Sequence, residues 1–210
     1  MYQTIIDSWE VAQLCDSGAK VVILDCRFNL MDVEQGRTLF LQGALPKAQY
    51  VDLNRQLSSE VRPDSGRHPL PSRESALALF SALGIDSSVQ VVVYDDCSGA
   101  MAARAWWLLQ WLGHRACAVL DGGIQAWQGD GFELVPGSTA EVTVASFSAA
   151  PSAFVALSTE DILSERYQLV DARAAARFQG EQEPIDPVAG HVPGAQNWPF
   201  QQNLDGDGRL

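Results

Sequence analysis

Short apolar runs alternate with segments of helical periodicity along the first part of the chain. The short, mainly apolar runs at 21–24, 89–94 and 116–120 predict buried strands. Helices are predicted at 72–83 and 100–112, which stop at Gly84 and Gly113, and over the short segment 122–129. Strands that alternate with helices pair in parallel and are covered on both faces, so the pattern predicts an α/β fold.

The first strand and its surroundings recur later in the chain. The strand at 21–24 leads into Asp25-Cys26-Arg27, and Gln168-Leu169-Val170 leads into Asp171-Ala172-Arg173. Gly43 follows Asp25 by 18 residues, and Gly190 follows Asp171 by 19 residues. Solenoid repeats have periods of ~20–50 residues, so this much longer repeat indicates a duplicated domain.

The segment between the two copies is rich in Ser, Thr, Ala and Pro and has little helical periodicity. Such a composition is typical of an interdomain linker. We therefore predict a first domain over 1–137, a linker over 138–153 and the N-terminal part of a second domain over 154–210.

Charge and composition narrow the classes of partner. The formal net charge of -12 would repel a phosphate backbone, so no nucleic-acid partner is expected. No stretch approaches the ~18 apolar residues of a membrane span, and the first residues do not resemble a secretion signal. The four cysteines form no Cys-x-x-Cys pair and the three histidines are far apart, so we expect a cytoplasmic protein with free thiols and no metal.

Several short motifs occur in a fixed order. They are Leu24-Asp25-x-Arg27, Gly66-Arg67-His68-Pro69-Leu70-Pro71, Tyr94-Asp95-Asp96, Ala102-Ala103-Arg104-Ala105-Trp106-Trp107, Gly113-His114, Leu120-Asp121-Gly122-Gly123, Asp171-Ala172-Arg173, Arg177-Phe178 and Gly190-His191-Val192-Pro193-Gly194-Ala195. This ordered set resembles the tandem-domain rhodanese family of thiosulfate and 3-mercaptopyruvate sulfurtransferases. The resemblance implies two rhodanese-like domains, each a mainly parallel sheet flanked by helices, with the second one incomplete at Leu210.

The resemblance also implies a chemistry. In this family a cysteine in the second domain takes sulfane sulfur from thiosulfate or 3-mercaptopyruvate, becomes a persulfide, and passes the sulfur to cyanide or a thiol. Backbone N–H groups and a helix N-terminus stabilise the anionic sulfur. We expect no cofactor, a small anionic donor as the partner, and a monomer without membrane or nucleic-acid contacts.

The first copy differs from the family pattern at the position of the nucleophile. The family's active loop has the form Cys-x-x-Gly, and the residue three before Gly99 is Asp96, not Cys97. The first domain therefore resembles the family's inactive domain. The second copy contains no cysteine, so no catalytic residue is expected in this chain, and the nucleophile is expected after Leu210.

One substrate-binding residue is expected within the chain. Arg177 matches the arginine with which the family pairs the donor anion, and a guanidinium suits this role because it binds oxyanions through two donors. A surface arginine without a functional role is the alternative. The mercaptopyruvate branch often carries another arginine just before the Gly-His motif. The segment 183–189 has none, which favours thiosulfate.

Two other functions remain open. The chain could be a noncatalytic rhodanese-like binding or regulatory protein, or a thiol enzyme that uses Cys97, which lies between a strand and a helix. A phosphatase signature would need five residues between Cys97 and an arginine, and six separate it from Arg104. We interpret the Asp-x-Arg pairs as structural and His191 as a turn-fixing residue.

Overall fold

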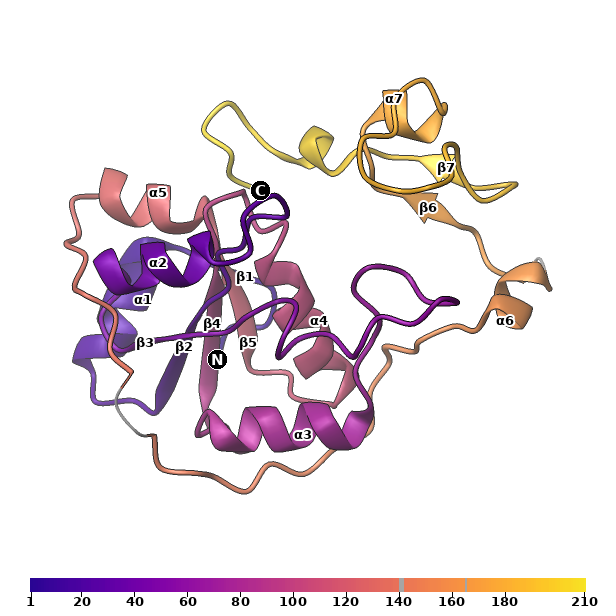
Figure 1. Cartoon of the computed structure of the whole chain (residues 1–210). Coiled ribbons are helices and arrows are strands. Elements are labelled where there is room, and N and C mark those ends of the chain that lie inside the picture. The colour runs from indigo at the N-terminus through magenta and orange to yellow at the C-terminus, as the bar shows by residue number, and fades with distance from the viewer. Residues whose placement is uncertain (140–141, 165) are drawn as a thin grey trace. The chain divides into compact units, whose positions relative to one another are not determined.

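The computed structural model describes residues 1–139, 142–164 and 166–210, which divide into two units, Met1–Phe154 and Val155–Leu210 (Figure 1). The predicted division into 1–137, 138–153 and 154–210 remains a proposal.

A five-stranded sheet forms the centre of the first unit. Its strands are β1 (Ile5–Ile6), β2 (Val21–Asp25), β3 (Ala48–Tyr50), β4 (Gln90–Tyr94) and β5 (Cys117–Leu120). Their order is β1-β5-β4-β2-β3, and all neighbours pair in parallel. The predicted α/β class is confirmed. The apolar pattern missed both edge strands, β1 and β3, because two or three residues are too short to show a periodicity.

Helices cover both faces of this sheet (Figure 1). One face packs against α3 (Arg73–Ala82) and α4 (Ala102–Trp111), and the other against α1 (Ser8–Asp16), α2 (Gln35–Gln42) and α5 (Gly123–Gly129). Alternate residues of β4 enter the two cores: Val91 and Val93 lie in the first, and Val92 and Tyr94 in the second. A strand buried on both faces has no polar side, which explains its continuous apolar run.

Helix α1 was not predicted, although its start has a sequence signature. The Asp7 carboxylate accepts a hydrogen bond from the Glu10 backbone N–H at 2.8 Å, and the Glu10 carboxylate accepts one from the Asp7 N–H at 3.1 Å. This reciprocal pair is a capping box, which satisfies two backbone donors that the helix start leaves free.

The described part of the predicted linker lies along the first unit. The backbone N–H of Ala145 donates to Ser81 O at 2.9 Å, and that of Ala150 donates to Leu112 O at 2.9 Å. The Phe147 ring is buried against Phe80, with 6.4 Å between the ring centroids. These contacts hold the segment against the ends of α3 and α4. Residues 140–141 of the predicted linker lie outside the described residues.

The second unit contains short elements. They are α6 (Thr159–Leu163), β6 (Val170–Asp171), α7 (Ala175–Phe178), β7 (Gln196–Asn197) and a 3-10 helix (Phe200–Asn203). Strands β6 and β7 pair in parallel, Val170 opposite Gln196 and Asp171 opposite Asn197.

The repeated Asp-x-Arg motif makes the same contacts in both units. In the first, Arg27 Nη2 contacts Asp25 Oδ2 at 2.6 Å and donates to Gly43 O at 2.7 Å. In the second, Arg173 Nη2 contacts Asp171 Oδ2 at 2.5 Å and donates to the carbonyl of Gly190 at 2.7 Å. The structural role predicted for both pairs is confirmed, because each ties a strand end to the glycine that follows in its copy.

Candidate functional site

The loop that follows β4 wraps around the carboxylate of Asp95. The side chain of Asp95 is fully buried. Its Oδ1 accepts hydrogen bonds from the backbone N–H groups of Cys97 and Gly99, both at 2.9 Å. Its Oδ2 accepts them from Met101 at 2.7 Å and Ala102 at 2.8 Å. Four amide donors therefore converge on one internal anion.

The backbone of this loop has the form of an anion-binding concavity. Ser98 (φ 57°) and Gly99 (φ 84°) are consecutive left-handed residues at the tip of the loop. Successive N–H groups in such turns form concavities that bind anions. Asp95 fills the concavity of the first unit, so its amide donors are not available to an external anion or to a persulfide.

Asp96 and Cys97 lie in the same loop and are half-buried. Burial, followed by the charge of Asp95, raises the pKa of Asp96. Burial also raises the pKa of Cys97, to about 12, and the charges of Asp95 and Asp96 add to this. A cysteine attacks as its thiolate, and this surrounding keeps the thiol protonated at neutral pH. The geometry therefore disfavours Cys97 as a nucleophile, and the equivalence of Asp96 with the family's nucleophile stays a prediction.

The other three cysteines lie away from this loop. Cys26 and Cys117 are fully packed in the apolar core, and burial raises the pKa of both thiols. Cys15 is only half-buried. It lies near the end of α1, where the neighbouring backbone is partly open to solvent. Cys15 lies on a helix and Cys117 at the start of a strand, so neither occupies a loop after a strand.

In the second unit, the predicted substrate-binding residue is held by two carboxylates. Arg177 lies on α7, and its side chain is 19% exposed. Its Nη2 donates to Glu183 Oε1 at 2.8 Å and to Asp186 Oδ2 at 2.8 Å, and its Nε donates to Glu183 Oε2 at 3.2 Å. The guanidinium is therefore oriented, and its positive charge is already compensated.

The two carboxylates differ in how firmly they are fixed. Glu183 is 5% exposed, and its Oε1 also accepts the backbone N–H groups of Ile185 at 3.1 Å and Asp186 at 2.9 Å. The Asp186 N–H and the Arg177 guanidinium lower the pKa of Glu183 to about 2. The side chain of Asp186 is 32% exposed, so it is the more accessible of the two.

These residues belong to a larger charged cluster. Arg173 Nη1 lies 3.5 Å from Glu183 Oε2, which links the Asp171–Arg173 pair to Arg177. The cluster holds three carboxylates and two guanidinium groups, those of Asp171, Glu183, Asp186, Arg173 and Arg177. An anionic ligand must therefore displace or rearrange a carboxylate to contact the whole guanidinium of Arg177. Sequence reasoning named the segment 183–189 only for its missing arginine. It did not find this pairing, because no helical spacing joins Arg177 to these acidic residues.

His191 fixes a turn beside the cluster. Its Nδ1 lies 2.7 Å from Phe178 O, and its ring stacks on that of Phe178 with 3.7 Å between centroids. This agrees with the predicted structural role of the residue.

Among residues 1–139, 142–164 and 166–210, no group of three or more His, Cys, Asp or Glu side chains could hold a metal ion. No helix in the same residues has the length and apolar character needed to cross a membrane.

Comparison with known proteins agrees with the fold and the motifs. The family described as Rhodanese-like domain matches residues 9–130. A Pseudomonas aeruginosa protein named as a probable 3-mercaptopyruvate sulfurtransferase is 44% identical over 196 residues, which are 90% of this chain and 69% of that protein. The chain belongs to the rhodanese family of sulfurtransferases.

Other members of this sulfurtransferase family are similar over the whole chain. The Mycobacterium tuberculosis protein SseB, whose name gives thiosulfate as the donor, is 40% identical over 98% of this chain and 74% of its own length. The crystal structure of SseA, a 3-mercaptopyruvate sulfotransferase from Escherichia coli, matches with a TM-score of 0.83 and 29% identity, over 100% of this chain and 79% of that one. A Leishmania major 3-mercaptopyruvate sulfurtransferase matches with a TM-score of 0.80 and 29% identity, over 99% of this chain and 58% of that one.

Proposed function

We propose that this rhodanese-family protein moves sulfane sulfur from thiosulfate or 3-mercaptopyruvate to cyanide or a thiol through a cysteine persulfide. The relatives named for these two donors support the choice of substrates. A cytoplasmic location is supported by the four cysteines, all of which are free thiols in the structure.

In the proposed reaction a thiolate attacks the outer sulfur of thiosulfate or the thiol sulfur of 3-mercaptopyruvate. With thiosulfate the S–S bond breaks, and sulfite leaves with the electron pair. With 3-mercaptopyruvate the C–S bond breaks, its electron pair stays on the carbon as an enolate, and protonation of this enolate gives pyruvate. Cyanide or a thiolate then attacks the outer sulfur of the persulfide, and the enzyme thiolate is restored. The reaction is covalent catalysis in two half-reactions.

The attacking cysteine is proposed to lie after Leu210 rather than among the four cysteines of this chain. The observation that carries this assignment is the occupied loop of the first unit: Asp95 takes the four amide donors that a persulfide would need. The pKa of about 12 at Cys97 supports the same assignment.

Arg177 is proposed to bind the anionic donor. Its guanidinium is partly exposed and oriented by Glu183, and a bidentate cation is suited to the sulfonate end of thiosulfate or the carboxylate of mercaptopyruvate. The absence of an arginine from the segment 183–189 supports a preference for thiosulfate.

The test compares this chain with the same chain extended by the coding sequence that follows Leu210. We expect thiocyanate formation from thiosulfate and cyanide only with the extended chain. In that chain, Arg177→Gln should raise the KM for the donor about tenfold or more, since a charge-assisted pair is lost. Arg166→Gln, which removes a 69% exposed arginine of the same unit, should leave the KM unchanged. Equal activity of the two chains would contradict the proposal.

A noncatalytic binding or regulatory protein is the second candidate. The observation in its favour is that both anion sites in the described residues are occupied by internal carboxylates, Asp95 in one unit and Asp186 with Glu183 in the other. An extended chain that carries a Cys-x-x-Gly loop, yet binds thiosulfate without forming thiocyanate, would favour this candidate.

A further inference from the structure

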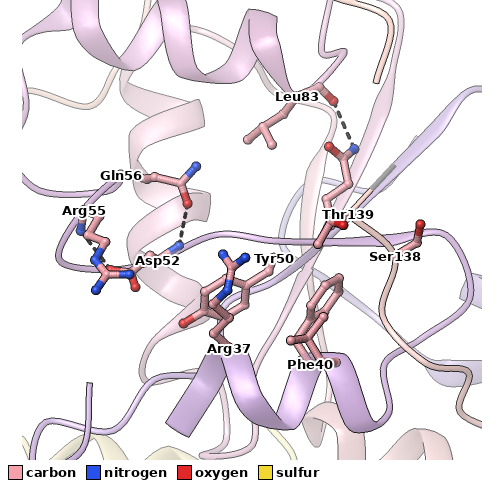
Figure 2. A pocket seen from close by; sticks show the side chains of 11 residues that line it. Arg37, Phe40, Tyr50, Asp52, Arg55, Gln56, Leu83, Ser138 and Thr139 are labelled. Carbon is pink, nitrogen blue, oxygen red and sulfur yellow. Dashed lines mark hydrogen bonds between the residues drawn. The ribbon is translucent and has the colours of Figure 1, made fainter. Parts of the chain in front are cut away.

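The first unit contains an open cavity that the sulfur-transfer chemistry does not use. Its volume is ≈ 330 Å³, and it lies beside the edge strand β3 (Figure 2). Ligand pockets have volumes of ~300–1,000 Å³, so the cavity suits a small molecule. Its walls come from α2, β3, the loop after β3, the end of α3 and residues 138–139.

Close backbone contacts fix the walls of this cavity. A Cβ on Gly36 would lie 1.9 Å from Arg27 O and 2.8 Å from Tyr50 Oη, so α2 rests directly on the end of β2 and on the β3 side chain. The Gly137 N–H donates to Phe40 O at 3.0 Å, which holds the returning segment against α2. The cavity is therefore formed before any ligand binds, which lowers the entropic cost of binding.

An unpaired guanidinium points into the cavity. Arg37 makes no hydrogen bond or ion pair with any residue that the structure describes, and Figure 2 shows its side chain directed toward the middle of the cavity. The neighbouring Arg55 differs, because it pairs with Glu34. Arg37 is exposed at the mouth of this open cavity, and in a chain with a net charge of -12 an unpaired arginine there is available to an anionic ligand.

The other lining residues favour a ligand with one charge and an apolar part. Gln56 Oε1 accepts the backbone N–H of Asp52 at 2.9 Å. The amide NH₂ group of this glutamine is therefore available to a ligand as a second donor, besides Arg37. The rings of Phe40 and Tyr50 lie 5.7 Å apart, and together with Leu41 they form an apolar wall. The carboxylate of Asp52, 5% exposed, lies at the same cavity and would repel a ligand with several negative charges.

We propose that this cavity binds a small organic monocarboxylate. Arg37 holds the carboxylate group, and the short carbon chain packs against Phe40, Tyr50 and Leu41. The proposed site consists only of residues of the first unit and does not depend on the proposed sulfur transfer.

The experiment titrates the full chain with butyrate, acetate and inorganic phosphate, and follows the backbone amide signals by NMR. We expect saturable shifts at residues 37–41 and 49–56 with butyrate, and weaker binding of both acetate and phosphate. Arg37→Gln should raise the dissociation constant for butyrate about tenfold, the loss expected for one charge-assisted pair. Arg62→Gln should not change it, because Arg62 is 75% exposed and does not line the cavity.

A second variant tests the apolar half of the site without disturbing the fold. Leu41 is 44% exposed, so Leu41→Ser should leave the other amide signals in place. It should weaken butyrate binding and not that of acetate. The proposal is overturned if butyrate causes no saturable shifts at these residues, if Arg37→Gln leaves its affinity unchanged, or if phosphate binds as tightly as butyrate.

Discussion

The guanidinium of Arg177 donates a hydrogen bond to the carboxylate of Asp186, with 2.8 Å between Nη2 and Oδ2. The residue proposed to bind the sulfur donor is therefore already paired with a carboxylate of the protein. Glu183 cannot easily leave this guanidinium, because two backbone N–H groups anchor its carboxylate. Asp186 is more exposed and is the carboxylate that a donor would displace.

Removing the charge of Asp186 should strengthen anion binding at Arg177. In Asp186→Asn the donor no longer competes with a carboxylate, and a partly exposed charge of this kind is worth about 1 kcal/mol, or roughly fivefold in affinity. The measurement is a thiosulfate titration of this chain, followed through the Arg177 Nε–H signal by NMR.

The control for this prediction removes the same charge elsewhere in the second unit. Asp207 is exposed and its backbone N–H donates to Asp205, away from Arg177, so Asp207→Asn should leave the affinity unchanged. An Asp186→Asn chain that binds thiosulfate no better than the Asp207→Asn chain would show that Asp186 does not compete with the donor.

Asp95 should be essential for the stability of the first unit. In Asp95→Asn one oxygen becomes an NH₂ group that faces backbone donors, so two of the four hydrogen bonds are lost and two amides stay buried without partners. Each such loss costs about 1–3 kcal/mol, so we expect the free energy of unfolding to fall by about 3 kcal/mol. Urea unfolding measures it. Asp96→Asn is the matched control, because Asp96 accepts none of these four bonds. A fall in the free energy of unfolding below about 1 kcal/mol in Asp95→Asn would contradict the role given to Asp95.

The thiol of Cys97 should react slowly and with a strong pH dependence. With its pKa raised to about 12, the thiolate fraction at pH 8 is about a thousandfold lower than for a thiol of pKa 9. The rate of alkylation by iodoacetamide should rise about tenfold per pH unit and show no plateau below about pH 11. Peptide mass spectrometry at several pH values measures this rate. Asp96→Asn should speed the reaction, and a plateau near neutral pH would mean that Cys97 is an activated thiol.

The two copies of the Asp-x-Arg motif should differ in what they contribute to stability. Arg27 is 6% exposed and its partner Asp25 fully buried, so Arg27→Met leaves an uncompensated buried charge and should cost about 3–5 kcal/mol. The side chain of Arg173 is 30% exposed, and solvent screens the same contacts, so Arg173→Met should cost about 1 kcal/mol. Urea unfolding, followed by NMR signals of each unit, compares the two. Equal losses would mean that burial does not set the strength of this pair.

The central strands of the fold could be predicted from the sequence, and the edges of the sheet could not. Strand β4 is buried on both faces, so its apolar run is continuous and easy to find. Strand β1 has two residues, of which only Ile6 is buried, and such a pattern does not stand out from a loop. Helix α1 shows that a local signal was available in Asp7 and Glu10, although apolar periodicity alone did not reveal it.

The candidate site shows the same division between local and long-range information. The position of Asp96 relative to Gly99 follows from sequence spacing alone. The role of Asp95 depends on the path of the loop, which brings amides up to seven residues away onto one carboxylate. Likewise, Arg177 meets Glu183 and Asp186 through an irregular turn, and no sequence periodicity encodes that contact.

The most direct test of this account asks whether any cysteine of the chain carries sulfur. The chain is incubated with thiosulfate or 3-mercaptopyruvate, alkylated after unfolding, and examined by peptide mass spectrometry for a persulfide on Cys15, Cys26, Cys97 and Cys117. The account predicts no stoichiometric persulfide on any of them, whereas the chain extended past Leu210 forms one on a cysteine of the added sequence. A stoichiometric persulfide on Cys97 of the present chain would contradict it.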